Sequence, residues 1–142
     1  MTLNKALLAR TLAHIEANPE TFNGQFWRSG TTMDFAGHAA IQAGAEWLST
    51  VDDDTSIRLP QCGDSQSVAV FRSSVVRTPA PESRLMHVAD FAAQALGIDD
   101  ITEDALFDDV SVADLAAMIH DLLDYGVATD PTPVTQEEVT AP

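Results

Sequence analysis

The chain has 142 residues, of which 45% are hydrophobic, and its net charge at pH 7 is -15. This length and apolar content predict one domain with a small core and exclude a disordered polymer. No apolar run approaches the roughly 20 residues that a membrane-spanning helix needs, and the first twenty residues lack the apolar core of a signal peptide. We therefore expect a cytoplasmic protein or a component of an assembly built there. The single cysteine, Cys62, excludes an internal disulfide and a multi-cysteine zinc site.

The charge is distributed unevenly along the chain. All seven basic residues lie at or before Arg84, whereas nine of the 22 acidic residues precede Leu85 and 13 follow it. Since this second part has no cation to neutralise phosphate, it is expected to repel nucleic acid and anionic membranes. It is expected to attract a basic protein surface instead. An acidic surface also keeps a protein soluble, so charge alone assigns no task.

The first predicted helix begins after a cap at Thr2 or Asn4. It is expected to end before Pro19, because proline disfavours a helical conformation at the preceding residue, Asn18. Its apolar residues recur at helical spacing on one face. They are Leu3, Leu7, Leu8, Leu12 and Ile15.

A loop over residues 19–30 separates this helix from the next. Its three aromatic residues predict packing onto the core or a contact surface, because aromatic side chains are favoured at interfaces. They are Phe22, Phe26 and Trp27. The second helix is predicted over 32–48, where many Ala and Gly residues let another element approach closely. Its predicted core contacts are Phe35, Ile41, Ala45 and Leu48.

Residues 56–78 change to a pattern rich in β-branched residues. This pattern predicts two or three short strands with a loop near Gly63. A third helix is predicted over 83–97, with Gly97 as a left-handed cap at its end.

Two further helical segments follow in the acidic part of the chain. A short helical turn is predicted over 102–107 with Thr102 as its cap. The last helix is predicted to start at Ser111, which forms a capping box with Asp114, and to end at Gly126.

These elements predict an α+β fold that is mostly α. About four helices pack with a small antiparallel β-hairpin in a single globular domain over residues 1–126. Residues 127–142 contain three prolines and no apolar periodicity, and they predict a disordered acidic tail.

Asp34 and His38 are the strongest candidates for a reaction site. They are four residues apart, so their side chains can meet on a helix, as an aspartate that orients a catalytic histidine would. Cys62 or a serine would have to supply the nucleophile, and no nucleophile elbow is present. The alternative is that Asp34 lies in the first turn of a packed helix, where the helix dipole favours a negative charge. We adopt the packing interpretation and assign no catalytic residue.

No motif in the chain indicates a metal or a cofactor. The four histidines, His14, His38, His87 and His120, fall on four different predicted elements without metal-binding spacing. The run Asp52–Asp54 lacks the order of a calcium loop. Glycine spacing matches neither a dinucleotide-binding nor a phosphate-binding loop. We therefore predict no metal site and no cofactor, although a metal site assembled from distant residues stays an alternative.

Residues 14–44, HIEANPETFNGQFWRSGTTMDFAGHAAIQAG, resemble an uncharacterised family of small actinobacterial and actinobacteriophage proteins with the motif C-G-T-x-x-C-F-A-G-[WH]-A. Residues 92–119, AAQALGIDDITEDALFDDVSVADLAAMI, resemble the C-terminal half of that family. The resemblance implies common ancestry and carries no activity with it. Here the motif reads SGTTMDFAGHA, so Ser29 and Asp34 replace both cysteines, and any role of a cysteine pair is excluded in this chain.

The leading hypothesis is a non-enzymatic accessory protein of phage or actinobacterial origin that binds a host protein with a basic surface. A sharper form is DNA mimicry, in which carboxylates occupy the nucleic-acid site of that host protein. Two alternatives stay open, namely a virion component and a small enzyme or metal-binding protein built on Asp34 and His38. The predicted protein-binding residues are Asp99, Asp100, Glu103, Asp104, Asp108 and Asp109.

Overall fold

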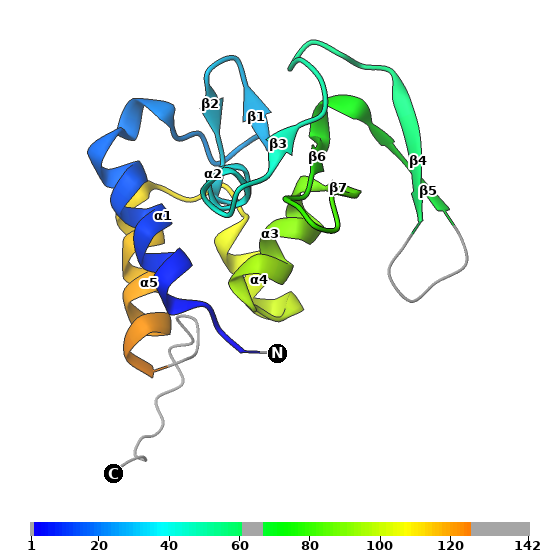
Figure 1. Cartoon of the computed structure of the whole chain (residues 1–142). Coiled ribbons are helices and arrows are strands. Elements are labelled where there is room, and N and C mark those ends of the chain that lie inside the picture. Colours follow the sequence, from blue (N-terminus) through cyan, green and yellow to red (C-terminus); the bar gives the residue numbers. More distant parts are fainter. Residues whose placement is uncertain (1, 61–66, 126–142) are drawn as a thin grey trace.

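The computed structural model describes residues 2–60 and 67–125, which form a helical body with small antiparallel sheets (Figure 1). The described helices are α1 (Lys5–Ala17), α2 (Phe35–Gln42), α3 (Val88–Leu96), α4 (Asp100–Leu106) and α5 (Val112–Tyr125). The predicted class, α+β and mostly α, is confirmed. The predicted helix end at Gly126 and the predicted tail over 127–142 lie outside the described residues. Within the described ranges, no helix is both long and apolar enough to cross a bilayer.

The strands pair in three separate antiparallel sheets. One is a short hairpin, another is a longer hairpin that extends away from the helical body, and the third has three strands (Figure 1). The short hairpin is β1 (Arg28–Ser29) with β2 (Thr32–Met33), and the long one is β4 (Ser56–Pro60) with β5 (Ser67–Phe71). In the third sheet, β6 (Val75–Arg77) lies between β3 (Glu46–Trp47) and β7 (Leu85–His87).

The strands predicted within 56–78 are confirmed as β4, β5 and β6. The predicted loop near Gly63 lies outside the described residues. Two single-turn 3-10 helices, η1 (Pro19–Thr21) and η2 (Arg72–Ser74), connect neighbouring elements.

The core lies between the helices. The first helix, α1, lies beside the last, α5, and α2 packs against α3 (Figure 1). Small side chains on α2 and α3 allow this close approach, as the Ala- and Gly-rich sequence predicts. The buried apolar residues of α1 and α5 are Leu7, Leu8, Leu12, Ile15, Leu115, Ile119 and Leu122.

The first helix follows its prediction closely. The Asn4 side chain caps it by accepting a hydrogen bond from the Leu7 N–H at 3.0 Å, so Asn4 and not Thr2 is the cap. The helix ends at Ala17, before the Asn18–Pro19 step that disfavours helix.

The second helix is shorter than predicted. It ends at Gln42, the chain turns at Gly44 with a φ of 98°, and Glu46 and Trp47 form β3 instead. Pairing of β3 with β6 overrides the helical pattern there, because a ladder with a buried strand outweighs local propensity. Of the predicted core contacts, Phe35 and Ala45 are buried. Ile41 and Leu48 are only half-buried.

The predicted start of the third helix is also wrong. Leu85–His87 form β7 against β6, and α3 begins at Val88 with His87 as its cap. The predicted end is confirmed, since Gly97 has a φ of 71° in the left-handed region.

Of the caps predicted for the last two helices, that of α4 is wrong and that of α5 is confirmed. Asp99, not Thr102, caps α4, because the Asp99 carboxylate accepts the Thr102 N–H at 2.8 Å. An aspartate placed one residue before the helix is the better acceptor for its free N–H groups. Ser111 does cap α5 as predicted, accepting the Asp114 N–H at 3.1 Å.

Candidate functional site

The six predicted protein-binding residues lie on α4 and the connections on either side of it. We call this set, Asp99, Asp100, Glu103, Asp104, Asp108 and Asp109, the acidic face. All are exposed except Glu103, which is half-buried. Asp100 and Asp104 are four residues apart on the solvent side of α4, so their carboxylates are neighbours.

The carboxylates of the acidic face influence one another electrostatically. Partial burial raises the pKa of Glu103, and the negative charges of Asp90, Asp100 and Asp104 raise it further. The Thr102 N–H and hydroxyl, which donate hydrogen bonds to Asp99, lower the pKa of that carboxyl. Asp90 belongs to α3 and was not among the predicted residues, because only the packing of α3 and α4 brings it near Glu103.

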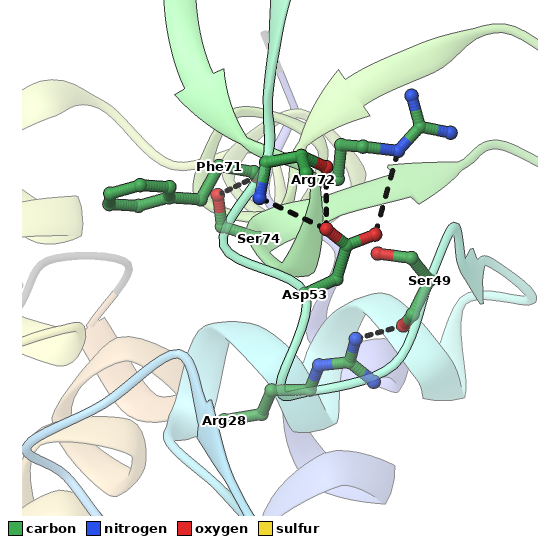
Figure 2. Close-up of polar contacts among 7 residues, drawn as sticks. Arg28, Ser49, Asp53, Phe71, Arg72 and Ser74 are labelled. Atoms are coloured by element: carbon green, nitrogen blue, oxygen red, sulfur yellow. Dashed lines mark hydrogen bonds and ion pairs between the residues drawn. The ribbon is translucent and has the colours of Figure 1, made fainter.

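No cation of the described residues pairs with the acidic face. The one ion pair in residues 2–60 and 67–125 joins Arg72 Nε to Asp53 Oδ2 at 3.7 Å, near the base of the β4–β5 hairpin (Figure 2). An apolar side chain accompanies the carboxylates, since Ile101 on α4 is 79% exposed. The surface around α4 therefore combines unpaired negative charge with exposed apolar area.

Asp34 and His38 do not form a dyad, although both are buried. Asp34 caps α2, and its Oδ1 accepts the Gly37 N–H at 2.9 Å. The His38 side chain contacts another part of the chain, where its Nε2 donates to the Thr21 carbonyl oxygen at 2.8 Å. The structure thus places Asp34 at the N-cap rather than inside the first turn, and Cys62 lies outside the described residues.

His38 is packed among rings and is 1% exposed. Its ring centroid lies 5.5 Å from that of His14 and 6.4 Å from that of Phe22. Burial lowers the pKa of His38, and the nearby His14 lowers it too, while the hydrogen bond to Thr21 opposes both. The neutral ring is therefore the folded form near pH 7.

Replacing His38 by alanine is expected to lower the free energy of unfolding by about 2–4 kcal/mol, through a cavity and an unpaired Thr21 carbonyl. Because the folded pKa is below the unfolded value, wild-type stability should fall as pH drops below about 6.5, and the variant should lose the part of this dependence that His38 contributes while keeping the part due to His87. Urea unfolding across this pH range measures both effects. An unchanged free energy of unfolding would contradict the packing role.

A pocket of about 490 Å³ has Asp34 among its lining residues. The loop before β1 lines it with Phe26 and Trp27, and the segment around η2 lines it with Phe71 and Ser74. His87 and Phe107 line it from β7 and from the end of α4. We call it the Asp34 pocket. Its volume is within the range of small-molecule pockets.

Asp34 is the most unusual group in this pocket. Its side chain is 2% exposed, and burial raises its pKa to about 8, against the opposing backbone N–H groups of Gly37, Asp34 and Ala36. No side-chain donor and no cation of the described residues pairs with its carboxyl group. Asp34 is therefore mainly protonated at neutral pH.

The other two ionisable residues of the pocket have partners of their own. His87 Nδ1 accepts the Ala89 N–H at 3.0 Å as the cap of α3, and burial lowers the pKa of this ring. The Arg28 guanidinium lies 4.3 Å from the Trp47 ring centroid and donates to the carbonyl oxygens of Ser49 and Ser73. Figure 2 shows its contact with Ser49. Neither residue forms an ion pair with Asp34.

Sequence reasoning did not find this pocket, because its residues come from five separated segments. The one signal was the aromatic loop, and Phe26 in it is indeed 53% exposed. Within the described residues, no group of three or more histidine, cysteine, aspartate or glutamate side chains is placed to hold a metal ion. Comparisons with protein-family models, with curated proteins and with solved structures find no match to this chain.

Proposed function

We propose that this protein is a non-enzymatic binding protein whose acidic face docks on a basic surface of a partner protein. The observation that carries the proposal is the combination on α4 of exposed, unpaired carboxylates with Ile101, which is 79% exposed. Charge steers the encounter and selects a basic partner, whereas a buried apolar contact supplies affinity.

The resemblance to actinobacterial and actinobacteriophage proteins supports an actinobacterial or phage origin and carries no role with it. In the sharper form of the proposal, the partner is itself a nucleic-acid-binding protein, and the acidic face occupies its phosphate-binding site. The net charge of -15 disfavours direct contact with nucleic acid or an anionic membrane. A structural role in a virion is the competing function, and it predicts the protein in purified particles.

The test is capture of partners from an actinobacterial lysate on the tagged protein, with washes at about 0.05 M and about 0.5 M salt. A protein with a basic surface, released at the higher salt and identified by mass spectrometry, supports the proposal. Binding that ignores salt, or a partner without a basic surface, contradicts it.

Neutralising Asp100 and Asp104 together, as Asp100→Asn and Asp104→Asn, is expected to weaken partner binding by about tenfold or more. The matched control is Asp52→Asn with Asp54→Asn, because it changes the net charge equally at two exposed residues outside the acidic face. Binding of the purified partner by titration calorimetry measures both pairs. Equal weakening by the two pairs would indicate net charge alone and would contradict a localised face.

The contribution of the exposed Ile101 side chain to partner binding is tested separately, with a control of its own. Ile101→Ser should weaken binding while leaving the unfolding temperature unchanged, since Ile101 is exposed. Tyr125→Ser removes a similarly exposed side chain, 76% exposed at the end of α5, and should leave binding unchanged.

A further inference from the structure

We propose that the Asp34 pocket receives one arginine side chain of the partner protein, with the Asp34 carboxylate holding the guanidinium group between aromatic walls. This inference rests on the proposed function and deepens it, because it identifies where a basic partner is anchored. Four observations carry it: the aromatic lining, the buried carboxyl, the connection to the acidic face and the engagement of the other charged groups.

The pocket offers aromatic surface at its base and at its rim. Trp27 and Phe107 meet edge to face, with ring centroids 6.4 Å apart. Phe26 and Phe71 also line the pocket and are 53% and 60% exposed. In Figure 2, the Phe71 ring points away from the pair formed by Arg72 and Asp53. Planar guanidinium groups stack on aromatic faces, so such walls favour arginine.

The carboxyl group inside the pocket lacks the counterion that a buried acid ordinarily has. Asp34 is 2% exposed, and in the described part of the chain only backbone N–H groups donate to it. The fixed fork of an arginine side chain matches a carboxylate, because two parallel N–H groups can donate to its oxygens. An arriving arginine would therefore supply the missing partner.

The pocket is continuous with the acidic face. Gln25 lines the pocket, and its Nε2 donates to Asp109 Oδ2 at 3.4 Å. Phe107, another lining residue, directly precedes Asp108. A basic surface that docks on the acidic face thus places its next cationic side chain at the mouth of the pocket.

The charged groups around the pocket leave Asp34 available. Arg28 is held by Trp47, Ser49 and Ser73, and Arg72 pairs with Asp53. His87 is occupied as the cap of α3 through Nδ1, and burial lowers its pKa. Two helix N-termini border the pocket, which would favour an anion, but each is already capped by Asp34 or His87. The guanidinium of Arg28 also lines the pocket and opposes a second cation, but the acidic face beside the pocket opposes an anion and, together with an ionised Asp34, favours a cation.

Binding should be coupled to ionisation of Asp34. A guanidinium group pairs with the carboxylate and not with the protonated acid, so binding releases a proton. With the pKa of Asp34 raised to about 8 by burial, affinity should rise about tenfold from pH 7 to pH 9. His87 is neutral throughout this interval because burial lowers its pKa, so it does not contribute to the change.

The experiment uses N-acetyl-arginine methylamide as the probe and follows the Trp27 indole N–H by NMR. A saturable shift of this signal is expected, and the neutral citrulline analogue should not produce it. Trp47 is the internal reference, because it does not line the pocket. The variant Asp34→Asn keeps an oxygen that can cap α2, and it should weaken binding of the probe by about tenfold or more. The control Asp52→Asn, at an exposed residue outside the acidic face and the pocket, should leave probe binding within about twofold of wild type.

The outcomes separate this inference from the proposed function. The absence of a saturable shift, or an equal shift in Asp34→Asn, overturns the inference. If the purified partner loses affinity for the Asp100 and Asp104 variant but binds Asp34→Asn normally, the acidic face stands and the pocket does not anchor the partner. If the probe binds and no partner is captured, the pocket binds guanidinium groups but both proposals about the partner fail. Weakened partner binding in both variants supports both.

Discussion

Replacing Asp34 by asparagine is expected to raise the free energy of unfolding at about pH 9 and to leave it nearly unchanged at about pH 4. Asparagine has almost the same shape, and its side-chain oxygen can still accept the Gly37 N–H that caps α2. The amide has no charge to bury. Urea unfolding of both proteins from about pH 4 to about pH 9 measures the difference.

The sign follows from the direction of the pKa shift. Burial raises the pKa of Asp34 from 3.8 to about 8 in the folded protein, so between these values the unfolded chain ionises while the folded protein stays protonated. Wild-type stability from this group is therefore complete below about pH 4 and is lost as pH rises to about 8. The shift corresponds to a loss on the order of 5 kcal/mol across that interval.

His38 and His87 act in the opposite direction, since burial lowers the pKa of each. Their contributions are the same in both proteins and cancel in the difference between wild type and variant. Asp34→Ala provides the control for the cap, with a loss of about 1 kcal/mol at low pH, where charge plays no part. A difference between wild type and Asp34→Asn that stays constant with pH would show that Asp34 titrates normally.

Alanine at Gly97 is expected to be the most destabilising of three glycine substitutions, with a loss of more than about 4 kcal/mol. Gly97 has a φ of 71°, and a Cβ there would lie 1.9 Å from the Thr2 carbonyl oxygen. Gly37→Ala should follow, because its Cβ would lie 2.7 Å from the Trp27 carbonyl oxygen. Gly30→Ala should cost only about 1 kcal/mol, since Gly30 has a φ of 58° but no atom within 4 Å of a Cβ.

The series separates two causes of the loss. The loss of stability in Gly30→Ala measures the cost of the left-handed backbone conformation, and the loss in Gly37→Ala measures the cost of the steric clash. The loss in Gly97→Ala includes both costs. Alanine is favoured over glycine in a helix by about 1 kcal/mol, so a loss at Gly37 can come only from the clash. Thermal and urea unfolding measure the order. A neutral or stabilising Gly37→Ala would show that the loop bearing Trp27 can move away from α2, which would also change the Asp34 pocket.

Local sequence signals were enough to predict much of the fold. The leucine spacing and Asn4 predicted α1, and Gly97 and Ser111 predicted one end of α3 and the start of α5. These features act within a few residues, where capping and periodicity are decisive. The predictions failed where a partner distant in sequence determines the conformation. Trp47 and Met86 lie in strands only because both pair with Val76 of β6.

The same reason limits what the sequence reveals about sites. The acidic face is contiguous in sequence, so its residues could be named from the charge pattern. The Asp34 pocket joins Trp27, Asp34, Phe71, His87 and Phe107, and no local pattern relates them. Asp34 and His38 are the opposite case, because a local pattern relates them but the structure does not join them. Their spacing predicts that the two side chains meet on a helix, yet Asp34 accepts the Gly37 N–H and His38 donates to the Thr21 carbonyl oxygen.

The pairing of α1 with α5 has a consequence for synthesis of the protein. The apolar face of α1 leaves the ribosome well before α5, whose Leu115, Ile119 and Leu122 form part of its cover. Until α5 has emerged, that face stays exposed to water and to other chains. The core thus closes only after α5 has been translated, and a chain that stops before α5 lacks part of the cover of α1.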